Sequence, residues 1–203
     1  MIGKLFLVRH GESEYNKLGL WTGHTDISLA ENGLLEAKKA GEILKNERID
    51  VAYVSDLKRT QETFDEIKKV CGIDDIVCQA VGALNERDYG VHTGKNKWQV
   101  KEEIGEEEFQ RIRRGWDTKI EGGETLKDVF DRVVPYYKEG IKKDLLSGKN
   151  VLVVSHGNTL RALVKYLEDI DEAQVCNLEI GTGEVHCCTI DENGKSTCRE
   201  ILK

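Results

Sequence analysis

The chain has 203 residues, of which 33% are charged, and a net charge of −7. This length suits one α/β domain, residues 1–203, that can bury a sizeable core, whereas the acidic balance argues against general nucleic-acid binding, which needs an electropositive face. No apolar run approaches the roughly 20 residues that a membrane-spanning helix needs, so we expect no membrane partner either.

The first part of the chain alternates predicted strands and helices. The predicted strands are residues 5–8, 51–54 and 76–80, and the predicted helices are residues 31–46 and 57–70. A capping box of Ser28 and Glu31 is expected at the start of the first of these helices. This order favours a parallel sheet with right-handed crossovers. The first strand begins close to Met1, so we expect no signal or transit peptide and a cytoplasmic location.

Residues 81–123 break this alternation, because they are polar and hold clustered charges. We predict one helix there, near residues 106–115, and interpret the segment as a lid that shapes the substrate site. The elements predicted after it are helices at residues 126–134 and 159–167, a helix that ends near Leu146, a strand at residues 149–154, and two edge strands at residues 183–190 and 196–202. The sequence thus predicts a three-layer α/β sandwich, in which helices flank a mainly parallel central sheet, with a helical lid.

Six cysteines are spread along the chain, namely Cys71, Cys78, Cys176, Cys187, Cys188 and Cys198. None of them forms a Cys-x-x-Cys pair, and their spacing fits neither a zinc site nor a small secreted disulfide framework. We therefore predict that the thiols are reduced and mostly buried.

Two histidines occupy matching positions after predicted strands. The apolar runs at residues 5–8 and 151–154 lead into His10 and His156, and a glycine follows each histidine. In open α/β sheets the ligand crevice lies beyond the carboxyl ends of the strands, so we expect both imidazoles in one pocket. A single histidine after a strand is more often a structural residue, but the repetition favours a shared site.

Phosphoryl transfer would account for the residue types around these histidines. A phosphate needs guanidinium groups that match its oxygens, and Arg9 and Arg59 each follow a predicted strand. Gly11 would let the phosphate approach the backbone. A neutral histidine such as His10 is a suitable nucleophile, and a protonated His156 would stabilise the transferred group. Each arginine taken alone would more often form a surface salt bridge.

The chain also resembles a known family along essentially its whole length. Residues 7–16 (LVRHGESEYN) are similar to the signature of the histidine phosphatase superfamily. The motifs that resemble the cofactor-dependent phosphoglycerate mutases are residues 21–23 (WTG), 84–90 (LNERDYG), 94–97 (GKNK), 113–114 (RR), 123–128 (GETLKD), 134–138 (VPYYK) and 156–161 (HGNTLR). The histidine-centred signature is shared with phosphatases, whereas the middle motifs are more specific to mutases.

The resemblance implies interconversion of 3-phosphoglycerate and 2-phosphoglycerate, through a phosphohistidine at His10 that 2,3-bisphosphoglycerate primes, with no metal. It implies that Arg9, Arg59 and His156 surround the transferred group and that Glu86 is the general acid and base. The other implied substrate contacts are Gly11, Glu12, Ser13, Asn16, Thr22, Gly23, Arg87, Tyr89, Lys97, Arg113, Arg114, Gly157 and Asn158. The small phosphorylated carboxylate would place the protein in glycolysis and gluconeogenesis.

Three further histidines are not assigned to this chemistry. His24 stands where the family usually has tryptophan, and we expect it to be a half-exposed residue at the rim of the site. His92 is expected to be solvated in a loop, and His186 to lie on an edge strand without a role. The chain also lacks the insertion that longer family members have after residues 117–122, which leaves the oligomeric state open.

Two other functions remain open from the sequence. The first is a phosphatase on the same scaffold, with water as the acceptor, against which Lys97, Arg113 and Arg114 argue. The second is a catalytically inactive module that binds phosphorylated ligands. The presence of every expected catalytic residue makes the second alternative the weaker one.

Overall fold

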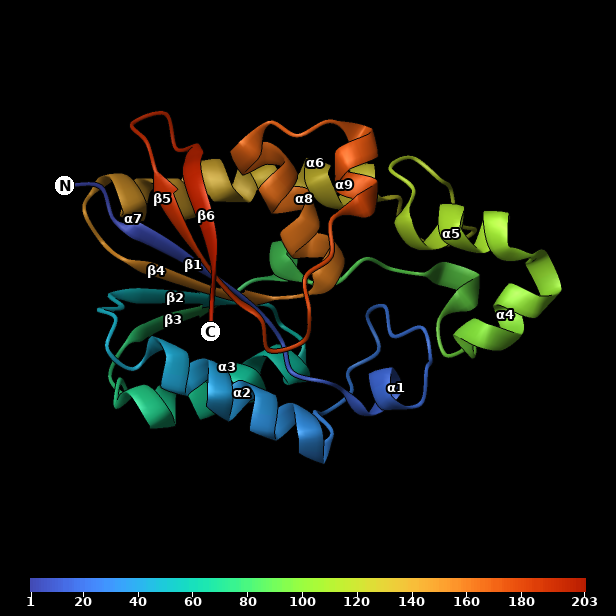
Figure 1. The fold of residues 1–203 in the computed structure, drawn as a ribbon, viewed down its shortest axis with the longest axis horizontal. Helices are drawn as coiled ribbons and strands as arrows, with labels where there is room; N and C mark the ends of the chain where they lie inside the picture. Colours follow the sequence, from blue (N-terminus) through green and yellow to red (C-terminus); the bar gives the residue numbers. More distant parts are fainter.

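The computed structural model describes residues 1–203 as a central sheet with helices on both of its faces (Figure 1). The six strands are β1 (Lys4–Arg9), β2 (Val51–Val54), β3 (Val77–Ala80), β4 (Val151–Ser155), β5 (Val185–Ile190) and β6 (Ser196–Leu202), in the order β3-β2-β4-β1-β5-β6. The first four of these strands are parallel to one another, and β5 and β6 are antiparallel to their neighbours. The predicted three-layer α/β sandwich with a mainly parallel sheet is confirmed.

Helices α2 and α3 cover one face of the sheet, and α6, α7, α8 and α9 cover the other (Figure 1). The α-helices are α1 (Glu14–Lys17), α2 (Glu31–Leu44), α3 (Lys58–Cys71), α4 (Lys97–Ile104), α5 (Glu106–Arg114), α6 (Leu126–Tyr136), α7 (Lys142–Leu146), α8 (Gly157–Glu168) and α9 (Glu172–Asn177). Two 3₁₀ turns, η1 (Gly82–Leu84) and η2 (Gly90–His92), and one π-helical turn, η3 (Tyr137–Ile141), complete the elements. None of the helices is both long enough and apolar enough to cross a bilayer.

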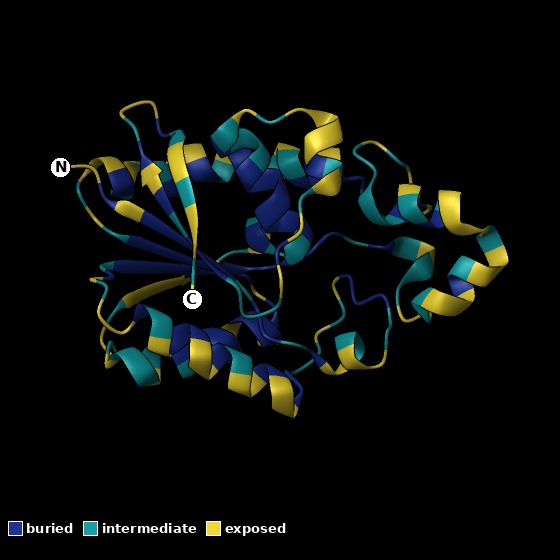
Figure 2. Ribbon diagram, in the orientation of Figure 1, coloured by how far each residue is buried: buried dark blue, intermediate teal, exposed yellow.

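The two faces of β1 build two different cores, because side chains alternate along a strand. Leu5 and Leu7 pack in the cluster that includes α6 and α8. Phe6 and Val8 pack in the cluster that includes α2 and α3. Figure 2 shows the inner strands as a buried layer between these helices. This burial fixes the carboxyl end of β1, from which the candidate site begins.

The lid segment, residues 81–123, differs in part from its prediction. It contains α5, close to the predicted helix, but also α4, which the sequence did not predict. Gly105 separates the two helices with φ 82°, in the left-handed region that favours glycine. Figure 1 shows both helices extending away from the sheet. They share a small core with Trp21, which comes from outside the lid.

Several local predictions were wrong because contacts with other segments of the protein change the local hydrogen bonds. Helix α2 begins at Glu31 with Ala30 as its N-cap and no capping side chain, so the expected capping box is absent. The Ser28 carbonyl instead accepts a hydrogen bond from the Glu14 N–H of α1. The sequence also missed α1 and α9, since both are too short for a helical period to be visible.

The position of β5 was also predicted incorrectly. Residues 183–190 were expected to form an edge strand, but β5 lies between β1 and β6. The hairpin to β6 covers its outer side, so its inward-facing residues are buried. The true edges of the sheet are β3 and β6.

The cysteines are free, as the prediction of reduced thiols requires. Only Cys188 is buried, however, so the prediction that most of them are buried was wrong. Cys78 and Cys198 are exposed because they lie on the edge strands β3 and β6.

Candidate active site

The site lies at the carboxyl ends of β1 and β4, where the two histidine corners meet. These strands are parallel neighbours, and Arg9 pairs in register with Ser155. His10 and His156 follow directly, so the sheet places their rings side by side, with centroids 4.9 Å apart and planes at 62°. The two histidines, far apart in the sequence, therefore form one buried pair, as the strand pattern predicted.

The protonation state of His10 suits a nucleophile. Its Nδ1 lies 2.6 Å from the Gly11 carbonyl oxygen, which can only accept, so Nδ1 holds the proton and Nε2 keeps a free lone pair. Burial, followed by the positive charges of Arg59 and Arg9, holds the pKa of His10 well below its usual value. His10 is therefore a neutral imidazole at pH 7.

The ring of His156 is held in place by two hydroxyl groups, which form a chain of hydrogen bonds. Its Nε2 is 2.8 Å from Ser55 Oγ, which is 2.7 Å from Thr60 Oγ1. Its Nδ1 is buried and has no partner in the protein. Burial, followed by the charge of Arg59, holds the pKa of His156 well below its usual value. The resting side chain is therefore neutral, and a dianionic phosphoryl group would favour its protonation.

Two arginines surround the histidine pair. Arg59 is fully buried, and its guanidinium donates to the Thr25 and Gly23 carbonyls, each at 3.0 Å. Arg9 donates from Nη1 to the Ile180 carbonyl at 2.7 Å. In both arginines Nε is buried without a partner. Burial lowers the pKa of Arg59 to about 10, so it stays charged at pH 7. These unused donors are suited to the oxygens of an anion.

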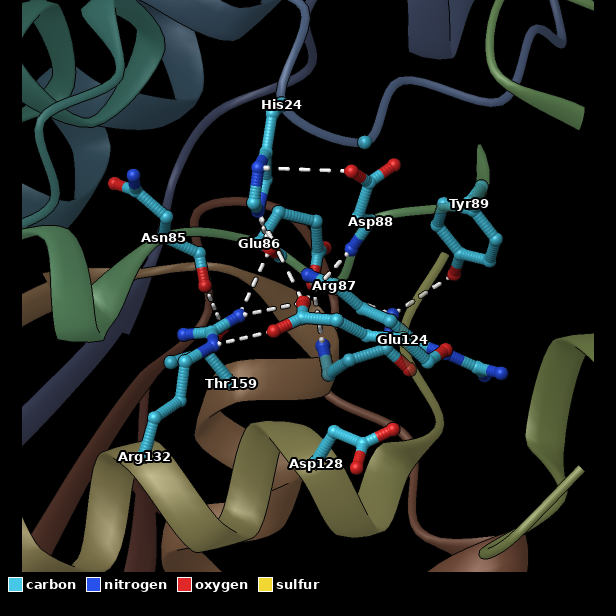
Figure 3. Close-up of polar contacts among 12 residues, drawn as sticks. His24, Asn85, Glu86, Arg87, Asp88, Tyr89, Glu124, Asp128, Arg132 and Thr159 are labelled. Atoms are coloured by element: carbon cyan, nitrogen blue, oxygen red, sulfur yellow. Dashed lines mark hydrogen bonds and ion pairs between the residues drawn. The ribbon is translucent and has the colours of Figure 1, made fainter. Parts of the chain in front are cut away.

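Glu86 provides a carboxylate in the same cavity. Its Oε1 accepts from the Arg87 N–H at 2.8 Å, and from the backbone N–H and Nδ2 of Asn158, each at 3.3 Å. Asn158 lies in the first turn of α8, and its Nδ2 also donates to the Tyr89 hydroxyl at 2.8 Å. Figure 3 shows Glu86 and Tyr89 on an irregular segment that also carries Asn85, Arg87 and Asp88. Glu86 is thus fixed by groups that leave its other carboxylate oxygen, Oε2, without a hydrogen bond in the protein.

His10 lines a cavity of about 200 Å³ that is rich in positive charge. Its lining consists of Arg9, His10, Asn16, Trp21, Thr22, Gly23, Arg59, Glu86, Tyr89, Lys97, Arg113, Arg114, Gly157, Asn158, Arg161, Glu179, Ile180 and Gly181. Most of these residues are among those that the sequence resemblance implied. No group of three or more His, Cys, Asp or Glu side chains is arranged to hold a metal ion.

Some lining residues were not predicted from the sequence. Arg161 belongs to the motif at residues 156–161. Its guanidinium donates to the Asn158 Oδ1 at 2.8 Å and to the Val175 carbonyl at 2.7 Å. Trp21 belongs to the motif at residues 21–23, and its ring packs on that of Tyr89, with centroids 4.4 Å apart. Residues 179–181 come from a loop that contains no recognisable motif. In that loop Glu179 forms an ion pair with Arg114.

Five of the implied site residues do not line the cavity. His156 lies behind His10, with which its ring is in contact. Ser13 caps α1, and the Glu12 N–H donates to Glu36 at 2.8 Å. Arg87 donates to the carbonyls of Ile112 and Thr118 within the lid and of Glu124 directly after it, which holds the lid segment together. The fifth residue is Gly11.

Gly11 is required for the packing of the turn after β1 against α2. A Cβ at this position would lie 2.2 Å from the carbonyl oxygen of Gly33 in α2. The two glycines therefore allow the turn after β1 to contact the backbone of α2. The contact with α2 is thus a reason for glycine at this position in addition to the expected approach of a phosphate.

The remaining histidines also differ in part from expectation. His92 is half-buried, and its Nδ1 is inaccessible and unpartnered, so it is less solvated than expected. His186 is fully buried between Glu184 and Arg199, whose Nη1 is 2.8 Å from Nδ1. It therefore has a structural role that an edge position would not give it. His24 is half-exposed at the rim, as expected.

Known proteins are similar to this chain in sequence and in fold. The chain matches the family model of the histidine phosphatase superfamily (branch 1) over residues 5–200. It is 42% identical to a 2,3-bisphosphoglycerate-dependent phosphoglycerate mutase of Parvibaculum lavamentivorans, and the alignment covers 98% of this chain and 95% of that protein. It is 41% identical to a phosphoglycerate mutase of Schizosaccharomyces pombe, with the same coverage of 98% and 95%.

Solved structures with the same fold are more distant in sequence. A mycobacterial glucosyl-3-phosphoglycerate phosphatase is similar with a TM-score of 0.84 at 24% identity, over 98% of this chain and 97% of that one. The α-ribazole phosphatase of Shigella flexneri is similar with a TM-score of 0.82 at 22% identity, over 98% and 95%. Together with the paired histidines, the family match shows that the chain belongs to the histidine phosphatase superfamily.

Proposed function

We propose that the protein interconverts 3-phosphoglycerate and 2-phosphoglycerate through a phosphohistidine at His10. The observation that supports this best is that several cations line one small cavity. Arg9 and Arg59 lie beside His10, and Lys97, Arg113 and Arg114 line the same cavity. This number of cations suits a small molecule with two anionic groups, such as a phosphate and a carboxylate. The names of the relatives at 41% and 42% identity agree with this function.

In the proposed mechanism, the Nε2 lone pair of His10 attacks phosphorus, and the phosphoryl group is held on the ring. The Nδ1–H of His10 stays on the Gly11 carbonyl, which keeps Nε2 aimed at the same point throughout the cycle. Arg9 and Arg59 offer unused Nε donors to the oxygens on which charge accumulates in the transition state, and a protonated His156 would offer its Nδ1–H as well. Their burial strengthens each of these interactions, because water does not screen them.

Glu86 would act as the proton-transfer group. When the phosphoryl group leaves His10 for a substrate hydroxyl, that hydroxyl must lose its proton, and the carboxylate of Glu86 lines the same cavity. In the opposite direction the same group returns the proton to the leaving oxygen. Asn158 and the Arg87 N–H hold one carboxylate oxygen, which leaves the other oriented for the exchange.

The cavity also fits the priming compound that the relatives' name implies. The unpartnered Nε atoms of Arg9 and Arg59 and the Nδ1 of His156 could hold one phosphate. Lys97, Arg113 and Arg114 could hold the carboxylate and the second phosphate. When bound, 2,3-bisphosphoglycerate supplies the phosphoryl group that charges His10.

An isomerisation assay tests this proposal directly. With 3-phosphoglycerate as substrate, we expect 2-phosphoglycerate to form rapidly when a trace of 2,3-bisphosphoglycerate is present and slowly when it is absent. Free phosphate is measured in the same samples. Little phosphate should be released, because the cavity lining holds a hydroxyl acceptor in preference to water.

Other results would identify a different function. Phosphate release from several small phosphate esters, without isomerisation, would support a phosphatase, which can use the same histidine pair. Tight binding of bisphosphoglycerate without phosphorylation of His10 would support a binding protein. Either outcome would overturn the mutase proposal.

The charge of Lys97 should make kcat/KM depend on pH. Burial, followed by the charges of Arg113 and Arg9, lowers the pKa of Lys97 to about 8. Because a lowered pKa means that the charge is lost at lower pH than usual, we expect kcat/KM to fall as pH rises through about 8. A Lys97→Arg variant keeps its charge, so its kcat/KM should stay level across this range, even at a lower absolute value. The same decline in both proteins would show that Lys97 does not bind the substrate.

A further inference from the structure

The rim segment, residues 23–25, is held on the wall of the site by Arg59. This guanidinium donates to the carbonyl of Gly23 through Nη2 and to the carbonyl of Thr25 through Nη1, each at 3.0 Å. The residue between the two anchored carbonyls is His24. A group that is proposed to hold the phosphate therefore also fixes the backbone on both sides of His24.

The side chain of His24 reaches from this segment to the backbone of Glu86 (Figure 3). Its Nε2 is 2.7 Å from the Glu86 carbonyl oxygen. A carbonyl can only accept, so Nε2 bears the proton and donates. Two carboxylates face the ring, with Asp88 Oδ2 3.9 Å from Nδ1 and Glu124 Oε2 3.9 Å from Nε2. The Glu124 carboxylate lies on the side of the Nε2 donor and favours a proton there.

Glu86 is held from its other side by an arginine. Arg132 Nη2 donates to the same Glu86 carbonyl at 3.0 Å, and Arg132 is itself fixed by Glu124 at 2.8 and 3.0 Å. Thr159 Oγ1 donates to the preceding carbonyl, that of Asn85, at 2.6 Å. Figure 3 shows these groups converging on the segment. The Glu86 carbonyl thus has two donors, of which His24 is the one that comes from the rim.

We propose that His24 is a positioning residue that connects the two halves of the site. Arg59 fixes the rim segment, and His24 extends from that segment to the backbone of Glu86. The imidazole of His24 therefore links the phosphate-holding guanidinium to the backbone that carries the proton-transfer carboxylate, and it helps to set the distance between them. Misplacement of a reacting group by about 1 Å can reduce the rate on the order of 100-fold. The proposal rests on the mutase function and on the role of Glu86 in it.

The test compares two substitutions of His24. His24→Leu removes the donor and keeps most of the volume, and we expect kcat to fall about 10-fold while KM changes less than about 2-fold, since one of two donors to the carbonyl remains. His24→Gln places an amide N–H close to the position of Nε2, and it should restore kcat to within about 3-fold of wild type. As a control, His92→Leu alters a half-buried histidine that has no hydrogen bond to Glu86, and it should keep wild-type kcat.

A double substitution separates positioning from a general effect on folding. Glu86→Gln alone should lower kcat on the order of 100-fold. If His24 acts through Glu86, adding His24→Leu to this variant should lower kcat no further. An equal 10-fold loss in both backgrounds, or failure of His24→Gln to restore activity when its melting temperature matches wild type, would overturn the proposal. Absence of isomerisation in the wild-type protein would instead refute the proposed function.

Discussion

Substitution of His10 by alanine is expected to lower isomerisation on the order of 10⁴-fold, because no other group can hold the phosphoryl group between its two transfers. His10 is the lining histidine, and its Nδ1–H is bound to the Gly11 carbonyl, so its free Nε2 faces the reaction. Incubation with labelled 2,3-bisphosphoglycerate should give wild-type protein a label that is lost in acid and kept in base. His10→Ala should show no label.

The matched control for this experiment is His92→Ala. His92 is half-buried near the same cavity but does not line it, so the variant should keep both the label and the activity. Melting temperatures of the two variants establish that each is folded. A label that persists in folded His10→Ala would place the phosphoryl group on another residue and would refute the mechanism.

Substitution of Arg59 by methionine should lower kcat/KM about 10³-fold, which is the order of loss for one buried donor to transition-state charge. It should also change the pH profile. Burial and the charge of Arg59 hold the pKa of His10 below its usual value. Without that charge the pKa of His10 rises, so His10 is protonated, and inactive as a nucleophile, at a higher pH than in wild type. The acidic limb of kcat/KM should therefore move to higher pH.

Arg59→Lys separates the charge from the hydrogen bonds. Lysine keeps a positive charge, so the acidic limb should stay near its wild-type position. It cannot donate to the Gly23 and Thr25 carbonyls together as the guanidinium does, so kcat/KM should still fall. If the acidic limb stays in place in Arg59→Met, with the fold intact by melting temperature, the charge of Arg59 does not control His10.

Features that depend on local pattern were predicted well from the sequence. The apolar runs gave the strands β1, β2 and β4, and the two histidines that follow β1 and β4 came together because adjacent parallel strands end at the same edge. The resemblance of the motifs led to most of the residues that line the cavity. These predictions succeeded because the spacing of apolar residues and the residue types at turns can be recognised within a few neighbouring residues.

Features that depend on contacts between distant segments were not visible in the sequence. Gly11 packs directly against the backbone of Gly33 in α2. His186 is buried because β6 covers β5. Glu179 reaches the cavity from a loop without a motif. The sequence by itself therefore determined the strands, the catalytic residue types and their order. Only the tertiary structure decided protonation, burial and the link from His24 to Glu86, because each of these depends on which distant groups exclude water from a side chain or donate to it.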